Sequence, residues 1–410
     1  MLLQETIEKT VVSQKDQFQH QERIINRDLM NKIPIQNKFA IIISGVRRSG
    51  KSTLMRSIAE KIGSFHYISF EDPRLYGFEL ADFERLEDVF NKINGKTNYY
   101  FFDEIQLVDK WEFYVRKLSD QHKYVIITGS NASLLSKELG TKLTGRNLRY
   151  ELYPFSYKEF LTYLNKKEGL ESFSHYLVQG GFPEYLLLKD PKILRSLVGD
   201  SLFRDIAVRH KIRNVQQLNE LAIYLISNVA KEFSYNSLRK MFNFGSTNSV
   251  SKFISFLEES YLLSSLPKFD YSLRKQIANP KKIYGIDTGL IVNNSRTFSE
   301  DFGKLLENLV FTHLKSEQAQ LFYFKEKKEC DFVIRTGTKI TAAIQVCHTL
   351  DDFNKEREFK GLQEAIQKFK LSEGTLLTMN QEDEFTIEGK KIIVRPVWKW
   401  LLDHSFSTSL

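Results

Sequence analysis

The feature that most constrains this chain is the stretch GVRRSGKS at residues 45–52, which fits the pattern G-x-x-x-x-G-K-[ST] at every required position. The apolar run KFAIIIS (38–44) precedes it, and a helical pattern follows from Lys51 to about residue 62. Because such a loop connects a strand to a helix, the stretch predicts an α/β fold. Its glycines let backbone N–H groups turn inward around an anion, and the helix start adds a positive dipole end.

This pattern predicts a phosphate-binding loop for a nucleotide such as ATP. Lys51 is expected to neutralise the β- and γ-phosphates, and the Ser52 hydroxyl is expected to ligate Mg²⁺. The alternative is a glycine-rich turn with an incidental lysine. The residues expected to contact the nucleotide are Gly45, Arg47, Arg48, Ser49, Gly50, Lys51, Ser52 and Thr53.

A second acidic motif, YYFFDEIQ, lies at residues 99–106. Its apolar strand is expected to deliver Asp103 to the carboxyl edge of a sheet, where it can hold Mg²⁺ beside Ser52. Glu104 then stands where a carboxylate can polarise an attacking water, so it is the expected catalytic residue with Lys51. An Asp-Glu pair can also be the acidic start of a helix, but the phosphate loop upstream favours the catalytic interpretation.

Short apolar runs alternate with helix-length segments up to residue 155, which predicts a parallel sheet. One run, SFHYISFE (64–71), lies between the phosphate loop and Asp103. This extra strand and the adjacent glutamate resemble the additional-strand, catalytic-glutamate branch of P-loop NTPases, which includes the AAA+ ATPases. The resemblance implies that a polar residue after the next strand senses the γ-phosphate. Asn131 is favoured over Ser130, and a helix N-cap is the alternative.

The resemblance also implies a site shared between subunits. Arg146 lies just before the strand pattern 148–153, where AAA+ proteins place an arginine that completes a neighbouring subunit's site. That role would require a homo-oligomer; Arg149 is the competing candidate, and a solvated surface arginine is the other alternative. The usual lid arginine is not evident. Instead GGFP (180–183) breaks the lid helices, similar to signalling-type and Orc-like P-loop ATPases, or as a simple helix-ending turn.

The middle of the chain resembles a winged helix-turn-helix, because residues 234–269 have the order helix, turn, helix, strand. The segment YSLRKQIANPKK (271–282) has four basic residues and no acids, as expected of a wing that contacts phosphates. A packing module with solvated charges is an equal alternative, so double-stranded DNA and a partner protein both stay open. The residues expected to face outward from the second helix are Asn248, Ser249, Ser251 and Lys252.

Near the C-terminus, ECDFVIRTGTKITAAIQVC (329–347) contains two strand patterns around a turn. With the helix before it, this stretch resembles a restriction-endonuclease-like core, whose acids hold a divalent metal and whose lysine aligns water. Glu307, Asp331 and Gln345 match the positions of that metal site. Cys347, however, stands where the lysine belongs.

Two substitutes for the missing lysine are conceivable, Lys355 and Lys360 on the next helix. The metal site would have only two anionic ligands, Glu307 and Asp331, which is few for a divalent ion. We therefore expect a nuclease-like fold with a degenerate site and no nuclease activity.

The composition is that of a soluble intracellular protein. The 410 residues suffice for two or three domains, and the net charge of +8 leans weakly toward an anionic partner. Two cysteines, Cys330 and Cys347, give neither a disulfide framework nor a four-ligand zinc site. Without a signal-peptide pattern or an apolar stretch of membrane-spanning length, we expect a cytoplasmic protein and no membrane partner.

Across nearly the whole chain, the motifs together resemble one family: prokaryotic AAA-type P-loop ATPases with a winged helix and a C-terminal restriction-nuclease-like domain of unknown function. The expected organisation is an ATPase core (1–155), a helical lid (156–212), a winged helix (213–295) and the nuclease-like domain (296–410). The motifs are GVRRSGKST, FFDEIQ, TGSNASLL, LTGR, YPFSYKEF, GGFPEYL, KKIYGIDTGL and ECDFVI.

The resemblance implies binding of ATP and ADP and hydrolysis with Mg²⁺, coupled to the C-terminal modules. One alternative is a nucleotide-gated switch that docks DNA or protein with negligible turnover. The other is an ATP-regulated nuclease.

Overall fold

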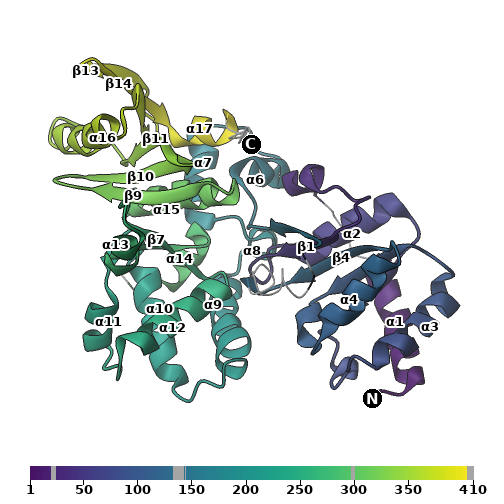
Figure 1. The fold of residues 1–410 in the computed structure, drawn as a ribbon. Helices are drawn as coiled ribbons and strands as arrows, with labels where there is room; N and C mark the ends of the chain where they lie inside the picture. Colours follow the sequence, from purple (N-terminus) through teal and green to yellow (C-terminus); the bar gives the residue numbers. More distant parts are fainter. Residues whose placement is uncertain (20–24, 133–142, 144, 297–300, 404–410) are drawn as a thin grey trace. The chain divides into compact units, whose positions relative to one another are not determined.

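The computed structural model describes residues 1–19, 25–132, 143, 145–296 and 301–403 (Figure 1). The chain forms two compact units, Met1–Leu152 and Tyr153–Leu410. The finer division into four domains stays a prediction.

The first unit is built on five parallel strands in the order β2-β3-β4-β1-β5. The apolar runs of the sequence form these strands, so the predicted parallel α/β fold is confirmed. Strand β4 lies between β1, which leads into the phosphate loop, and β3, which carries Asp103. The extra strand that the sequence indicated, SFHYISFE (64–71), contains β2, which pairs with β3 at the edge of the sheet. The bounds are β1 Ala40–Ser44, β2 His66–Ser69, β3 Tyr99–Asp103, β4 Tyr124–Gly129 and β5 Asn147–Glu151.

Helices cover both faces of this sheet (Figure 1). Successive strand residues point to opposite faces, so Ile42 and Phe102 pack toward α1 (Gln4–Gln19), α3 (Asp82–Asn94) and α4 (Trp111–Asp120). Ile41, Phe101 and Ile126 pack toward α2 (Lys51–Ile62) on the other face. Because both faces are buried, the strands read as continuous apolar runs rather than as alternating patterns.

The second unit begins with helices that surround the Gly-Gly-Phe-Pro turn. Phe155 N donates to Gly181 O at 2.8 Å, and Gly181 N donates to Asp287 Oδ2 at 2.7 Å. The turn is therefore attached to α14 (Thr288–Asn294), which Asp287 caps. The helices are α6 Tyr157–Leu164, α7 Leu170–Gln179, α8 Pro183–Leu188, α9 Pro191–Asp200, the π-helix η5 Ser201–Val208 and α10 Val215–Ser227.

A small antiparallel sheet follows, with strand order β6-β8-β7. The element order along the chain in this region is helix, strand, two helices, strand, short helix and strand, and the winged-helix interpretation of it stays a prediction. The short helix α13 lies in the segment expected to be a wing. The bounds are β6 Glu232–Phe233, α11 Tyr235–Met241, α12 Thr247–Glu259, β7 Leu263–Pro267, α13 Leu273–Ala278 and β8 Lys281–Gly285.

The C-terminal part contains a six-stranded mixed sheet in the order β13-β14-β12-β11-β10-β9. Asp331 lies on the second of these strands along the chain and Gln345 on the third, after the helix that carries Glu307. The polar strand β13 was not expected from the sequence. The bounds are α15 Phe302–Ser316, β9 Gln320–Lys325, β10 Glu329–Thr336, β11 Lys339–Val346, α16 Lys355–Phe369, β12 Glu373–Thr378, β13 Asp383–Ile387, β14 Lys390–Pro396 and α17 Val397–Asp403.

Candidate functional site

The phosphate loop joins the carboxyl end of β1 to the first turn of α2. Gly45 passes so close to Leu152 that a Cβ at this position would lie 2.2 Å from the Leu152 carbonyl oxygen. Gly50 has a φ of 94°, a left-handed conformation that favours glycine. Backbone geometry therefore explains both glycines of the motif.

The ammonium group of Lys51 is buried within this loop. Its Nζ donates to the carbonyl oxygens of Gly45 and Val46, each at 3.0 Å, and lies 4.0 Å from Glu104 Oε1. Burial lowers the pKa of Lys51, whereas the carboxylates of Glu104 and Asp103 oppose that shift. A cation in this position is suited to neutralise a phosphate.

Asp103 ends β3 and reaches the loop through Ser52. The Ser52 hydroxyl donates to Asp103 Oδ2 at 2.8 Å, and the Thr128 hydroxyl donates to Oδ1. Burial and the neighbouring Glu104 carboxylate raise the pKa of Asp103, and the two hydroxyl donors partly counteract this rise. A hydroxyl beside a carboxylate offers the oxygen ligands that Mg²⁺ prefers, so this pair fits the predicted metal position.

Glu104 is held at the same edge of the sheet by donors from its own turn and from the residue that follows β4. Its Oε2 accepts from Ser130 N at 3.1 Å, from Ser130 Oγ at 3.0 Å and from the Gln106 side chain. The residue has a φ of 52°, which few non-glycine residues adopt. The structure therefore brings Glu104 together with Lys51, as the sequence predicted.

Ser49 gives an independent sign that the loop fits an anion. Its hydroxyl oxygen is buried, and it has no hydrogen-bond partner among the residues that the structure describes. A buried hydroxyl left in this state costs about 1–3 kcal/mol. A phosphate oxygen would supply the missing partner, so the loop fits the nucleotide phosphates expected from the sequence.

Three contacts around the loop were not predicted from the sequence. The buried Arg27 donates to Ser49 O at 2.8 Å, and Arg47 pairs with Glu71 at 2.6 Å. Thr128, the hydroxyl donor to Asp103, is the third. Arg27 lies in a polar lead-in without any motif, so no sequence signal could have identified it. Thr128 belongs to the motif TGSNASLL, two residues before Ser130. Its place near the end of a strand beside β3 could have indicated a contact with Asp103.

The proposed γ-phosphate sensor, Asn131, and the proposed intersubunit arginine, Arg146, lie at opposite edges of the sheet. Asn131 is buried directly after Ser130, at the edge of the sheet where Glu104 lies. Arg146 precedes β5 at the opposite, amino edge, where its side chain is 55% exposed and pairs with Asp120 at 2.7 Å. A five-residue strand spans about 17 Å, so Arg146 is remote from the phosphate loop of its own chain. Arg149 lies within β5, and its Nε donates to Asn147.

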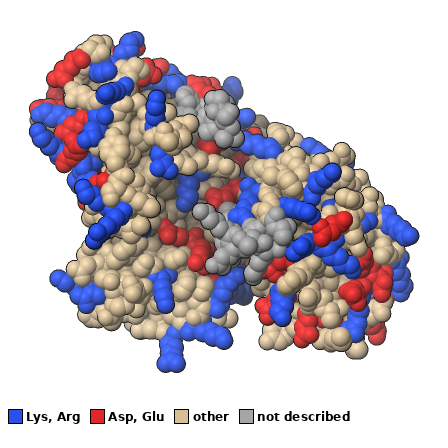
Figure 2. Space-filling model, in the orientation of Figure 1, with Lys and Arg blue, Asp and Glu red and all other residues tan. Residues whose placement is uncertain are grey.

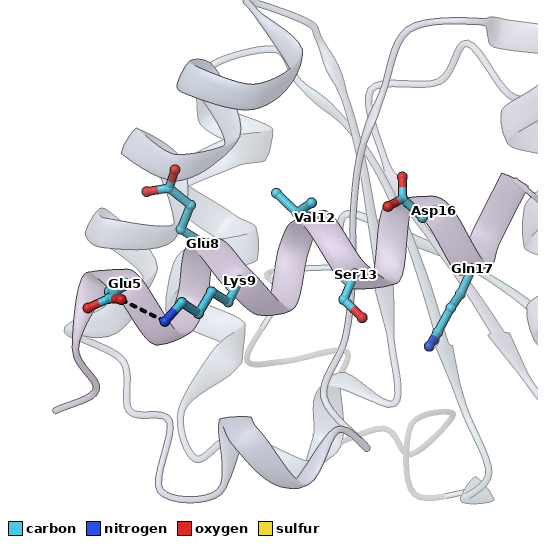
Figure 3. A pocket seen from close by; sticks show the side chains of 7 residues that line it. All are labelled: Glu5, Glu8, Lys9, Val12, Ser13, Asp16 and Gln17. Carbon is cyan, nitrogen blue, oxygen red and sulfur yellow. Dashed lines mark ion pairs between the residues drawn. The ribbon is translucent and has the colours of Figure 1, made fainter.

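Parts of two family motifs, residues 133–135 and 144, lie outside the described residues. A hollow of about 700 Å³ along α1 is not a candidate for the nucleotide site (Figure 3). A single helix lines it, and an ion pair between Glu5 and Lys9 crosses its surface. No phosphate-loop residue is among those that line it, which are Glu5, Glu8, Lys9, Val12, Ser13, Asp16 and Gln17.

The predicted nuclease-like site forms a cluster with an unexpected member. Glu307 and Asp331 lie together, but both bind the ammonium group of Lys282, at 2.8 and 2.9 Å. Lys282 belongs to the basic segment 271–282, for which phosphate contact and a solvated face were equal alternatives, and neither applies to this lysine because its side chain is only 2% exposed. The sequence also missed Glu329, a third carboxylate on the same ammonium at 2.7 Å.

Gln345 borders this cluster without contacting Lys282. Its Oε1 accepts from Asp331 N at 3.2 Å, and its Nε2 donates to Glu358 at 2.8 Å. Neither expected substitute fills the position of the missing lysine. Lys355 lies over the Phe385 ring at 4.1 Å. Lys360 pairs with Glu356 on α16.

Burial and the Asp331 charge raise the pKa of Glu307, and Lys282 opposes that rise. Across the described part of the chain, no group of three or more His, Cys, Asp or Glu side chains is arranged to hold a metal ion. No helix there is long and apolar enough to cross a membrane.

Comparison with known families divides the chain into three matched segments. Residues 37–161 match an AAA domain, which contains the phosphate loop, Asp103 and Glu104. Residues 170–301 match a domain of unknown function, DUF8612, and residues 302–400 match another, DUF4143. The chain therefore carries an AAA-type ATPase domain with a nucleotide-binding phosphate loop.

Two relatives extend over almost the whole chain. An uncharacterized protein of Methanocaldococcus jannaschii is 37% identical over 93% of this chain and 92% of its own length. An uncharacterized protein of Haemophilus influenzae is 28% identical over 89% of this chain and 94% of its own length.

Solved structures give more distant likenesses. AMPPCP-bound DnaA from Aquifex aeolicus is 18% identical, covering 58% of this chain and 90% of that one, with a TM-score of 0.29. A signal transduction ATPase with numerous domains from Pyrococcus horikoshii is 15% identical, covering 72% and 46%, with a TM-score of 0.27. On its domain matches and its archaeal relative, the chain belongs to the family of archaeal and bacterial proteins that join an AAA domain to a C-terminal DUF4143 domain.

Proposed function

We propose that this protein is a Mg²⁺-dependent ATPase that converts ATP and water to ADP and phosphate. The observation that carries the proposal is the convergence of Lys51, the Ser52–Asp103 pair and Glu104 at one edge of the sheet. The match to an AAA domain over this region supports nucleotide binding.

Each of these residues has a distinct role in the proposal. The loop N–H groups and Lys51 bind the phosphates and neutralise their charge. Ser52 and Asp103 hold Mg²⁺, which when bound neutralises charge on the phosphate oxygens. Glu104 orients the attacking water and accepts its proton. Ser130 and Gln106 fix the direction of the Glu104 carboxylate.

The test is phosphate release by Lys51→Ala, Glu104→Gln and the control Lys61→Ala, an exposed lysine at the end of the same helix. We expect Lys51→Ala to lose nucleotide affinity and release together. Glu104→Gln should still bind ATP while release falls by about 10²–10⁴-fold, the usual range for a lost general base. Lys61→Ala should behave as wild type. Release by Glu104→Gln at the wild-type rate would refute the assignment of the base.

One observation favours a second candidate, a nucleotide-gated switch with negligible turnover. The Glu104 carboxylate is engaged by Ser130 and Gln106, which compete with water for its oxygens. Under this alternative, wild type binds ATP tightly but releases no phosphate, and Ser130→Ala leaves release at zero. Measurable release that depends on Glu104 would exclude it.

We further propose that nucleotide state is passed to residues 213–295, acting as a winged helix that docks a partner. Asn248 and Lys252 on α12 are exposed, whereas the buried Lys282 no longer counts toward a basic wing. Figure 2 shows basic and acidic side chains mixed over much of the visible face, whereas the scattered charges over α10–α12 are mainly basic; scattered basic residues do not by themselves select DNA over protein. If double-stranded DNA raises phosphate release in wild type but not in Lys252→Ala, the partner is DNA. Release indifferent to DNA would select a protein partner in the cytoplasm.

A further inference from the structure

Lys282 lies at the centre of the C-terminal carboxylate cluster. Its Nζ is 2.7–2.9 Å from one oxygen each of Glu307, Glu329 and Asp331. These carboxylates come from α15 and from β10, whereas the lysine comes from β8 of the smaller sheet. One ammonium group therefore uses three ion pairs to connect two parts of the second unit.

Two of the remaining oxygens of the cluster have other partners, and Tyr284 adds a donor to a Glu307 oxygen that Lys282 already contacts. Asp331 Oδ2 accepts from Val346 N at 3.0 Å, and Glu329 Oε2 pairs with Lys325 at 3.1 Å. The Tyr284 hydroxyl donates to Glu307 Oε1 at 2.7 Å. Because buried carboxylates are costly unless they are paired, this arrangement accounts for their burial without a metal.

The ammonium group also stands where the nuclease-like pattern predicts a cation. Glu307 and Asp331 match the metal-ligand positions of a nuclease-like pattern that the sequence predicts to be degenerate, and the structure directs both toward Lys282 Nζ. A divalent ion coordinated by the same oxygens would need the volume that this nitrogen fills. The lysine and the metal are therefore mutually exclusive.

A second set of contacts keeps the lysine in place. The Asn308 side chain accepts from Gly285 N at 2.8 Å and donates to Gly285 O at 3.0 Å, so it holds β8 against α15 three residues after Lys282.

We propose that Lys282 is a built-in cation that takes the place of a divalent metal in this cluster, closing the site and fastening β8 to the C-terminal domain. This proposal is independent of ATP hydrolysis.

The experiment compares nucleotide-free wild type, Lys282→Met, Lys282→Met/Asp331→Asn and Asp331→Asn, with Lys275→Met as the control. Lys275 is an exposed basic residue of the same segment. Bound Mn²⁺ is measured by electron paramagnetic resonance, and the thermal midpoint is measured with and without Mn²⁺.

Wild type, Asp331→Asn and Lys275→Met should take up the same amount of Mn²⁺. Lys282→Met should lower the midpoint by about 5–10 °C, as expected when a buried charge loses its partner. It should also gain bound Mn²⁺ that raises its midpoint, and the double variant should lose this gain.

Two outcomes would overturn the proposal. One is Mn²⁺ uptake by wild type that Asp331→Asn abolishes, which would show a metal site open beside Lys282. The other is a folded Lys282→Met that gains no Asp331-dependent Mn²⁺. If Lys282→Met does not fold, the comparison of wild type with Asp331→Asn still decides, because the proposal requires equal Mn²⁺ uptake.

Discussion

Asp103 and Glu104 are adjacent in sequence, yet their carboxylates have different surroundings. Asp103 accepts from the hydroxyls of Ser52 and Thr128, whereas Glu104 accepts from Ser130 and Gln106. Burial and the Glu104 charge raise the pKa of Asp103, so its ionised form depends on its hydroxyl donors. In the proposed mechanism, these different hydrogen-bond partners suit the Asp103 carboxylate to a metal and the Glu104 carboxylate to water.

A valine at position 128 should therefore shift the pH dependence of Mg²⁺-dependent nucleotide affinity. Protonated Asp103 is a poor Mg²⁺ ligand, so affinity should fall on acidification, at a higher pH than an ordinary aspartate would require. Thr128→Val removes a donor that lowers the pKa of Asp103, so the midpoint should move to still higher pH. Fluorescent nucleotide titrations with and without Mg²⁺ measure this. Asp103→Asn should abolish the Mg²⁺-dependent part, and an unmoved midpoint in Thr128→Val would contradict the assignment.

At the scale of elements, β8 and the turn after it connect two sites of the second unit. Lys282 lies at one end in the carboxylate cluster. Asp287 lies at the other, where it accepts from Gly181 N and Leu290 N. A Cβ at Gly180 would lie 2.1 Å from Asp287 Oδ1, so this glycine is required by close packing. The segment therefore ties the Gly-Gly-Phe-Pro turn to the C-terminal domain.

Asp287 should make the stability of the protein depend on pH. Burial raises its pKa to about 6 from the ordinary value of 3.8, against the opposing effect of its backbone donors. Because the folded-state pKa is raised, its stabilisation is complete below the ordinary pKa and is lost as the pH rises through about 6. The loss corresponds to about 3 kcal/mol at most. Urea unfolding from pH 4 to 7 should show that the free energy of unfolding falls with rising pH in wild type but not in Asp287→Asn. Parallel curves would contradict it.

Elements defined by local pattern were predictable from the sequence, and contacts made across the fold were not. The strand–loop–helix of the phosphate site follows from apolar runs and glycines, so Lys51 and Asp103 could be placed together. The exposure of Lys282 was not predicted correctly, because the number of basic residues in a segment gives no information about the distant carboxylates that surround this lysine in the fold. Strand β13 was missed because DEFTI is polar and forms the edge of its sheet. Side chains such as Arg27 act only through tertiary contact.

At the scale of the whole molecule, the question is whether one copy suffices for activity. Arg146 is remote from the phosphate loop of its own chain and exposed at the opposite edge of the sheet. Its pairing with Asp120 involves two side chains that are both more than half exposed, which contributes little to stability. The guanidinium is therefore available to a second copy, which is how we interpret this residue.

Mixing variants tests that interpretation. Arg146→Ala and Lys51→Ala should each lose phosphate release, and a mixture of the two should regain part of it, because some interfaces pair an intact loop with an intact arginine. Arg116→Ala, an exposed arginine on α4, should keep wild-type release. Full activity of Arg146→Ala alone, or no recovery in a mixture shown to co-assemble, would contradict a role between subunits.

The lysine-filled cluster also has an evolutionary consequence. Once Lys282 is lost, three carboxylates at positions 307, 329 and 331 are left repelling each other in the interior, so a lineage cannot change this position alone without losing stability. Replacement of the lysine should therefore coincide with neutral residues at the acidic positions, or with recovery of a Glu/Gln-x-Lys strand that restores metal chemistry. These four positions should covary across descendants of this fold, even though 49 residues separate position 282 from position 331.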